Sequence, residues 1–165
     1  MTLESLNALD LLAARAALER CCGARRWIDG MLARRPFAGE SDLFGAALEI
    51  WERLGAEDWK EAFAHHPRIG DLSSLRDRWA GAEQAGSARA SEETLLALKE
   101  GNDAYFDKFG FIFIVNASGK SAADMLEILR RRLPRPIGEE IKEAAEQHAA
   151  ITRLRLEKML REVPS

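Results

Sequence analysis

Phe111-Ile112-Phe113-Ile114-Val115 is the stretch that decides the fold class, because it is the one run among the 165 residues that resembles a β-strand. The run is short and apolar, and it holds the β-branched and aromatic residues that favour strands. A strand needs a neighbour to satisfy its backbone hydrogen bonds, and the chain offers no second run of this kind. We therefore predict that residues 111–115 form buried extended backbone between helices. The predicted fold class is all-α, with no β-sheet.

Hydrophobic spacing typical of helices fills the chain on both sides of this stretch. Ser41, Ser91 and Ser121 are candidate N-caps, and Gly110 is a candidate helix terminator. No internal repeat or low-complexity linker occurs, so we predict one domain of about eight helices over residues 1–165. The expected helices are Leu3–Cys22, Trp27–Ala33, Ser41–Leu54, Glu57–His66, Ser73–Ala85, Glu92–Lys108, Ser121–Leu133 and Gly138–Leu160.

Composition narrows the class of protein. Apolar residues make up 47% of the chain and charged residues 31%, which is typical of a globular protein. The net charge of −3 gives no reason to expect a nucleic-acid partner. No apolar run approaches the roughly 20 residues of a membrane-spanning helix, and the N-terminus lacks the pattern of a signal peptide. We therefore expect neither nucleic acid nor a membrane as a partner.

Cysteine and histidine usage gives little sign of a metal or redox centre. Cys21 and Cys22 are adjacent in the sequence, and a disulfide between helix neighbours would be strained. Two reduced structural thiols, and a reducing compartment such as the cytoplasm, are the plainer interpretation. His65, His66 and Asp71 lack the i, i+4 spacing of helical metal ligands, so we expect no metal.

His66 is the first candidate for chemistry, because Pro67 follows it. The residue before a proline is disfavoured in the α region, so the helix is expected to end at about His66. Trp59 and Phe63 precede it at helical spacing, which predicts that His66 ends an apolar stripe. A helix C-terminus favours the protonated imidazole, whereas burial beside aromatic rings disfavours it. A histidine under these opposing influences is suited to proton transfer near neutral pH.

Glu83 is the second candidate. It follows Trp79 by four residues, and Leu72, Leu75 and Ala82 belong to the same apolar stripe. This spacing directs the carboxylate toward the interior, where an unpartnered glutamate is costly or has a raised pKa. A paired or functional role is one interpretation. A glutamate at the edge of the stripe, with its carboxylate in solvent, is the other.

Arg155 is the third candidate. On a helical wheel of the last helix it points into the apolar stripe, whereas Arg153 lies toward the edge. A guanidinium that points inward is suited to hold a carboxylate or a ureido oxygen. The structural alternative is an internal salt bridge, with Glu83 as a candidate partner. His148 shares this face, where a core role and a functional role are both open.

Two other motifs are weaker. Ser118-Gly119-Lys120-Ser121 imitates the end of a phosphate-binding loop, but Ile114 stands where that loop needs its first glycine. Arg130-Arg131-Arg132, with Arg135, suggests a nucleic-acid patch. Successive residues fan around a helix, however, so a solvated helix face is the favoured interpretation.

Five segments occur in a characteristic order and spacing. They are His66-Pro67-Arg68-Ile69-Gly70, Trp79-Ala80-Gly81-Ala82-Glu83-Gln84-Ala85-Gly86, Asn102-Asp103-Ala104-Tyr105-Phe106-Asp107-Lys108-Phe109-Gly110-Phe111-Ile112-Phe113, the Arg35-Pro36-Phe37 turn and the terminal Ile151-Thr152-Arg153-Leu154-Arg155-Leu156. Together they resemble the OHCU decarboxylase family, which acts on 2-oxo-4-hydroxy-4-carboxy-5-ureidoimidazoline (OHCU) in urate breakdown. Each segment alone is a weak signal, but the similarity spans nearly the whole chain.

The resemblance implies an all-α, cofactor-free enzyme, commonly a homodimer, that gives (S)-allantoin and CO2. It implies that His66 and Glu83 are catalytic, and that an arginine of the last helix joins them. The wheel favours Arg155 over Arg153 for that arginine. The chain departs from the family at Ala80, where many members have serine, and this puts one hydroxyl contact in question. The implied substrate contacts are Pro67, Ala80, Gly81, Ala82, Glu83, Gln84, Phe113, Ile114, Val115, Asn116 and Ala117.

The implied reaction matches the residues. Loss of CO2 leaves electron density that must be delocalised and then protonated on one face, which is a task for His66. Glu83 would orient the imidazole or the substrate, and Arg155 would hold a carbonyl or carboxylate. The alternative functions are a catalytically inactive protein-interaction module on the same fold, and a hydrolase of a neighbouring ureide.

Overall fold

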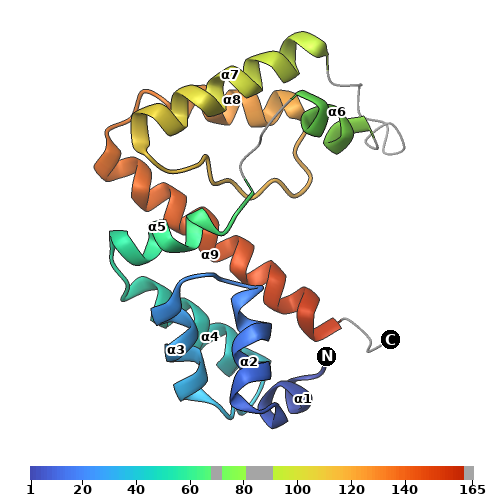
Figure 1. Ribbon diagram of the computed structural model, residues 1–165, viewed down its shortest axis with the longest axis vertical. Helices are drawn as coiled ribbons and strands as arrows, with labels where there is room; N and C mark the ends of the chain where they lie inside the picture. The colour runs from blue at the N-terminus through green and yellow to red at the C-terminus, as the bar shows by residue number, and fades with distance from the viewer. Residues whose placement is uncertain (68–71, 81–90, 162–165) are drawn as a thin grey trace. The chain divides into compact units, whose positions relative to one another are not determined.

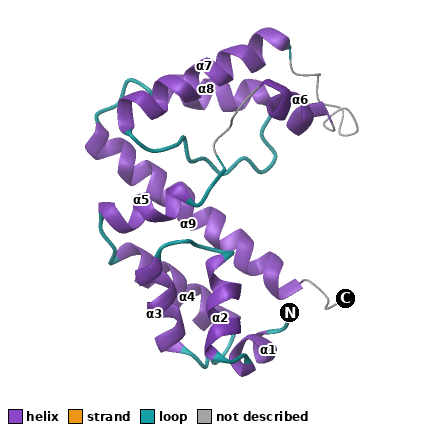
Figure 2. Ribbon diagram, in the orientation of Figure 1, coloured by secondary structure: helices purple, strands orange, loops and turns teal. Residues whose placement is uncertain are grey.

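The computed structural model describes residues 1–67, 72–80 and 91–161, without the side chains of residues 74 and 78–80. Every regular element in these ranges is a helix (Figure 2), and they contain no strand. The prediction of an all-α fold without a β-sheet is therefore confirmed for the described ranges. They hold nine helices, against the eight expected.

The chain divides into two compact units (Figure 1). The first comprises Met1–His65 and Ala145–Ser165, and the second comprises His66–Ala144. The long C-terminal helix α9, Ile137–Arg161, contributes its first turns to the second unit and the rest to the first. That the whole chain forms one domain stays a prediction.

The first unit contains five complete helices. They are α1 (Leu3–Ala8), α2 (Leu11–Glu19), α3 (Arg25–Arg34), α4 (Glu40–Glu52) and α5 (Ala56–Ala64). Together with most of α9 they bury an apolar core that contains two indole rings.

The two indoles, Trp27 and Trp51, tie the helices of this core together. Trp27 Nε1 donates a hydrogen bond to the Ala47 carbonyl at 3.0 Å, and Trp51 Nε1 donates one to the Ala145 carbonyl at 3.0 Å. Each indole therefore buries a large apolar surface with its one polar group satisfied. The second of these bonds connects α4 to α9.

Two predictions about helix caps in this unit are wrong. The segment expected to be one helix, Leu3–Cys22, is two helices, because the Asp10 side chain accepts the Ala13 N–H at 2.8 Å and starts α2 as its N-cap. Ser41 is not an N-cap, since α4 already begins at Glu40 after Gly39. The Asp10 cap therefore decides where α2 begins, whereas α4 begins without a side-chain cap.

The second unit contains α6 (Leu72–Ala80), α7 (Glu92–Phe109), α8 (Ala122–Arg132) and the start of α9. Ser91 and Ser121 cap α7 and α8 by accepting the backbone N–H groups of Thr94 and Asp124, as predicted. Gly110 ends α7 in the left-handed region with φ of 75°, which glycine adopts without strain. At Gly101, an added Cβ would lie 2.6 Å from Leu129 Cδ2, so any larger residue would make the Leu129 side chain move where α7 and α8 pack.

Residues 111–117 run between α7 and α8 without forming a helix or a strand, which agrees with the prediction that residues 111–115 form no sheet, although Ile112 and Val115 are only half-buried. Phe111 and Phe113 are buried, and their rings pack edge-on against Tyr105 at centroid distances of 5.9 and 5.3 Å. Ile114 is also buried, whereas Val115 is half-buried. The stretch therefore begins as core and becomes more exposed toward its end.

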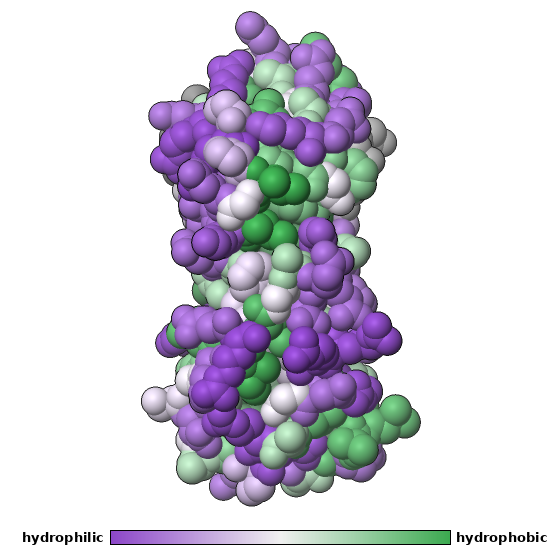
Figure 3. Space-filling model, turned by 90° about the vertical axis from the view of Figure 1, so that its left-hand side faces the viewer, coloured by the Kyte–Doolittle hydropathy of each residue, from purple (hydrophilic) through white to green (hydrophobic). Residues whose placement is uncertain are grey.

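The surface is mixed in polarity. On the face drawn in Figure 3, hydrophilic side chains surround smaller groups of hydrophobic ones. Leu11 and Leu12 of α2 are the most exposed large apolar side chains in the described part of the chain, at 67% and 79%. None of the described helices is both long and apolar enough to span a bilayer.

Candidate active site

His66 lies just beyond the end of α5. The helix ends at Ala64, two residues earlier than the predicted end, because the His65 N–H closes the last turn onto the Ala62 carbonyl at 3.2 Å. His66 is half-buried, and its Nε2 atom is shielded from solvent. Pro67 after it is exposed. The chain thus leaves the helix with an imidazole whose distal nitrogen faces the protein rather than water.

His65 has a different environment from His66. It lies against Gly23, where an added Cβ would be 2.2 Å from His65 Cγ. It also lines a cavity of about 370 Å³ in the first unit. The neighbouring histidines therefore differ in their surroundings, although both follow the same helix.

Arg155 lines the same cavity and is partly buried, as the helical wheel predicts. Its Nη1 atom donates a hydrogen bond to the Cys21 carbonyl at 3.3 Å, which holds the guanidinium against the turn that follows α2. Among the residues that the structure describes, the cavity lining contains four basic side chains and no acidic one. The lining residues are Ala17, Arg20, Cys21, His65, Arg155, Lys158 and Met159. Such a lining favours a negatively charged ligand.

Arg153 points elsewhere, also as predicted. Its side chain is 62% exposed, forms an i, i+4 ion pair with Glu157 at 3.0 Å and covers the Phe44 ring at 4.7 Å. Arg153 is therefore held on the outside of α9, beside a smaller apolar cavity at which it is the one basic residue among the described lining residues. Of the two arginines, Arg155 is the one that lines the basic cavity.

His148 is a core residue. It is fully buried and stacks on Trp51 at a centroid distance of 4.7 Å, with Phe63 at 5.7 Å. Thr152 Oγ1 lies 3.2 Å from its Nδ1 atom. Of the two roles that the sequence left open for His148, the core role matches this packing.

The backbone of residues 113–117 is held at two carbonyl groups. Arg132 Nη1 donates a hydrogen bond to the Ile114 carbonyl at 2.7 Å, and Lys120 Nζ donates one to the Asn116 carbonyl at 2.7 Å. Val115, which lies between them, is half-buried. Two basic side chains thus fix the course of the segment for which the sequence predicts substrate contacts.

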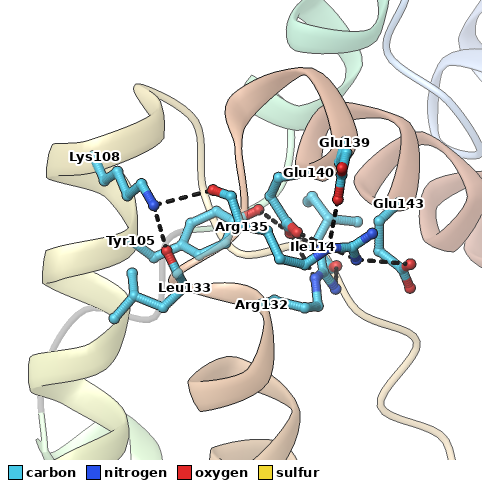
Figure 4. A network of polar contacts seen from close by, with 9 residues as sticks. All are labelled: Tyr105, Lys108, Ile114, Arg132, Leu133, Arg135, Glu139, Glu140 and Glu143. Carbon is cyan, nitrogen blue, oxygen red and sulfur yellow. Dashed lines mark hydrogen bonds and ion pairs between the residues drawn. The ribbon is translucent and has the colours of Figure 1, made fainter.

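Arg132 corrects one prediction. Arg130 and Arg131 are exposed, as expected for a solvated helix face, but Arg132 is fully buried. It pairs with Glu140, which is also fully buried, through Nη2 and Oε1 at 2.5 Å (Figure 4). Sequence periodicity contained the signal, because Arg132 follows Leu129 by three residues on the buried face of α8.

Several predicted site residues lie outside the described ranges. They are Gly81, Ala82, Glu83 and Gln84. Ala80 is the last residue of α6, but its side chain is not described. Within the first unit the structure brings Arg155 together with Arg20, His65 and Lys158. His66, Pro67 and residues 113–117 belong to the second unit.

The two cysteines are buried free thiols. Burial raises the pKa of Cys22 to about 12, so its thiol stays protonated at neutral pH. A protonated buried thiol is a poor nucleophile, and Cys22 is therefore a structural residue. No cluster of three or more metal-ligating side chains occurs in the described residues, and the expectation of a metal-free protein stays a prediction.

Comparisons of the sequence with known families and proteins all point to the same family. The sequence model of the OHCU decarboxylase family matches residues 7–157. The uric acid degradation bifunctional protein TTL of Arabidopsis thaliana is 35% identical over 147 residues, which cover 84% of this chain and 45% of that protein. The 2-oxo-4-hydroxy-4-carboxy-5-ureidoimidazoline decarboxylase of Haloferax volcanii is 24% identical over 161 residues, which cover 94% of each chain.

A solved structure is also similar. It is a crystal structure of OHCU decarboxylase in the presence of (S)-allantoin, with a TM-score of 0.74 and 32% sequence identity. The similarity covers 87% of this chain and 96% of that chain. By contrast, this chain spans 45% or less of the length of three bifunctional relatives that it matches.

Proposed function

Because the chain belongs to the OHCU decarboxylase family, we propose that it is a carboxy-lyase that converts OHCU to (S)-allantoin and CO2 without a cofactor. The observation that carries the proposal is the extent of the family match. It runs from residue 7 to residue 157 and includes the positions of His66, Glu83 and Arg155. The similar crystal structure obtained in the presence of (S)-allantoin supports the same product.

His66 is the proposed proton donor. In the reaction, the carbon–carbon bond to the carboxylate breaks, CO2 leaves, and the bonding electron pair is delocalised into the substrate. A proton then adds to one face, and this step sets the stereochemistry of the product. Imidazole is the side-chain group whose ordinary pKa lies nearest to neutral pH, which suits it to deliver that proton. The shielded Nε2 atom of His66 supports this role, because a donor kept from bulk water delivers its proton to a bound ligand.

Arg155 is the proposed anchor for a carboxylate or carbonyl oxygen of the substrate. The basic lining that Arg20, His65 and Lys158 add to its cavity supports this role. Charged hydrogen bonds from guanidinium groups to carboxylates are short and strong. OHCU carries a carboxylate until the bond breaks, so a basic cavity favours the substrate over a neutral product.

The remaining proposed contacts come from three segments of the chain. Residues 113–117 would bind the planar amide edges of the substrate, and their anchored carbonyl groups support this role. Pro67 and residues 80–84, with Glu83 as the group that orients the imidazole or the substrate, complete the proposed site. Ala80 supplies no hydroxyl, so we expect no contact from that side chain.

The test is the chirality of the product from freshly generated OHCU. Spontaneous decay of OHCU yields racemic allantoin, so we expect the protein to accelerate the decay and to give the (S) enantiomer. A racemic product formed at the spontaneous rate would contradict the proposal and favour an inactive interaction module. Release of urea or ammonia, instead of CO2, would favour a hydrolase of a neighbouring ureide.

We also propose a homodimer in the cytoplasm. The family resemblance supports the dimer, and the exposed Leu11 and Leu12 offer apolar surface for it. The free thiols of Cys21 and Cys22 support a reducing compartment. Analytical ultracentrifugation tests the dimer, and a sedimentation coefficient of a monomer at micromolar concentration would contradict it.

A further inference from the structure

A buried polar network occupies the second unit beside residues 113–117 (Figure 4). At its centre, Glu140 Oε1 accepts hydrogen bonds from Tyr105 at 2.6 Å and from Arg132 Nε at 2.6 Å. All three side chains are fully buried. Burial and the bond to Glu140 raise the pKa of Tyr105 above its ordinary value, so its hydroxyl remains a donor at neutral pH.

The guanidinium of Arg132 is used on two sides. Nε and Nη2 face Glu140, whereas Nη1 donates to the Ile114 carbonyl at 2.7 Å. The plane of the group also lies over the Phe113 ring, with Cζ 4.8 Å from the centroid. Contacts with Glu140, the Ile114 carbonyl and the Phe113 ring therefore fix the orientation of this planar group. Because its donors point in fixed directions, the bond to Ile114 also restrains the backbone of residue 114.

The rest of the network supports the position of Arg132. Lys108 Nζ donates to the carbonyls of Leu133 and Arg135, at 2.7 and 3.0 Å, in the turn after α8. Arg135 lies 3.8 Å from Glu140 Oε2 and pairs with Glu143 at 3.3 Å. These contacts hold the end of α8 and the start of α9, which carry the two buried charges.

Stability alone is a weak reason for such a pair. Burying two charges costs desolvation energy that their attraction only partly returns, and apolar residues of similar size are often as stabilising. A helix or a strand would hold the Ile114 carbonyl through its own backbone bonds, but residues 111–117 belong to neither. The buried pair supplies the missing donor at this one carbonyl.

We propose that Arg132, oriented by Glu140, is a positioning residue that fixes the backbone of residues 114–117 for the substrate. This inference rests on the proposed decarboxylase activity, because it assigns that segment to substrate binding. Arg132 does not touch the substrate; it sets the direction of the backbone groups that do. Loss of this anchor weakens substrate binding more than it slows the chemical step.

The experiment compares Arg132→Lys with Tyr105→Phe. The first keeps the buried charge beside Glu140 but replaces the planar group that reaches Ile114. The second removes a hydrogen bond to Glu140 and leaves the Arg132–Ile114 bond in place. For Arg132→Lys we expect KM for OHCU to rise about tenfold, with kcat changed less than about threefold. For Tyr105→Phe we expect both parameters to remain close to the parental values.

A second readout does not depend on activity. Backbone ¹⁵N relaxation of the free protein is expected to show residues 114–117 as rigid in the parent, with order parameters near about 0.85, and below about 0.6 in Arg132→Lys. If Arg132→Lys does not fold, the triple variant Tyr105→Phe/Arg132→Met/Glu140→Leu removes the whole polar group without leaving a buried charge. It is expected to show the same rise in KM and the same loss of order.

The outcomes separate the two proposals. A folded variant in which KM and the order parameters stay parental would overturn the positioning role. So would a loss of order that leaves KM unchanged. A parent that does not accelerate OHCU decay would instead overturn the proposed function, and the order parameters would still decide whether Arg132 holds the segment.

Discussion

The interiors of the two units are built differently around parts of the same helix. In the first unit, α9 fully buries no Asp, Glu, Lys or Arg among its described residues, and His148 lies flat on Trp51. In the second unit, the first turns of α9 bury Glu140 against Arg132. A regular helix places a side chain such as Arg155 by periodicity alone. Residues 111–117 form no helix or strand whose backbone hydrogen bonds would hold them, and the buried Arg132 side chain supplies a donor for the Ile114 carbonyl.

The largest expected loss of stability comes from a change in the buried Arg132–Glu140 pair. Glu140→Leu leaves the Arg132 guanidinium buried without its counter-charge, which costs about 3–5 kcal/mol of unfolding free energy. The matched change in the first unit is Met31→Leu, at a fully buried apolar position, where a swap of similar volume costs less than about 1.5 kcal/mol. Urea unfolding of both variants measures the difference. Equal losses would mean that the two interiors depend on the same kind of interaction.

The next largest effect concerns the packing of His65, which precedes His66, against Gly23. Gly23→Ala places a Cβ 2.2 Å from His65 Cγ, so the ring must move, at a cost of about 1–3 kcal/mol. Because His65 precedes His66, we also expect a loss of activity. Gly45→Ala is the control, since its Cβ meets no atom within 4 Å and alanine stabilises a helix interior. Thermal unfolding and OHCU turnover check both variants, and a Gly23→Ala protein with parental stability would contradict the contact.

The smallest effect is a dependence on alkaline pH. The folded protein holds the Cys22 proton more tightly than the unfolded chain. The contribution of this group to the unfolding free energy is therefore fully present below pH 9, and it is lost as the pH rises toward about 12. One proton gives a slope of at most about 1.4 kcal/mol per pH unit. In Cys22→Ala this contribution disappears, and the remaining slope belongs to groups such as Tyr105. An unchanged slope in urea unfolding between pH 9 and pH 11 would show that Cys22 does not titrate as described.

The sequence predicts the regular parts of the molecule well. Ser91, Ser121 and Gly110 mark helix ends because each satisfies backbone groups locally. The inward direction of Arg155 is predicted because a single helical wheel describes the whole of α9. That residues 111–115 form neither a helix nor a strand agrees with the lack of a partner strand in the sequence.

The missed features depend on choices that local patterns leave open. Asp10 is acceptable inside a helix and also as an N-cap, and only the fold selects the cap. Three consecutive arginines are typical of a solvated helix face, but Arg132 is buried because it shares a face of α8 with Leu129. The Arg132–Glu140 pair joins two helices, so neither helix alone indicates the partner.

The central claim is that His66, and not its neighbour His65, donates the proton. The most direct measurement is the rate and the enantiomeric excess of allantoin from freshly generated OHCU, for His66→Asn and His65→Asn side by side. For His66→Asn we expect kcat to fall by about 10²- to 10⁴-fold and the product to become racemic, whereas His65→Asn keeps the (S) enantiomer in excess. A His66→Asn protein that still makes (S)-allantoin at the parental rate would contradict the account.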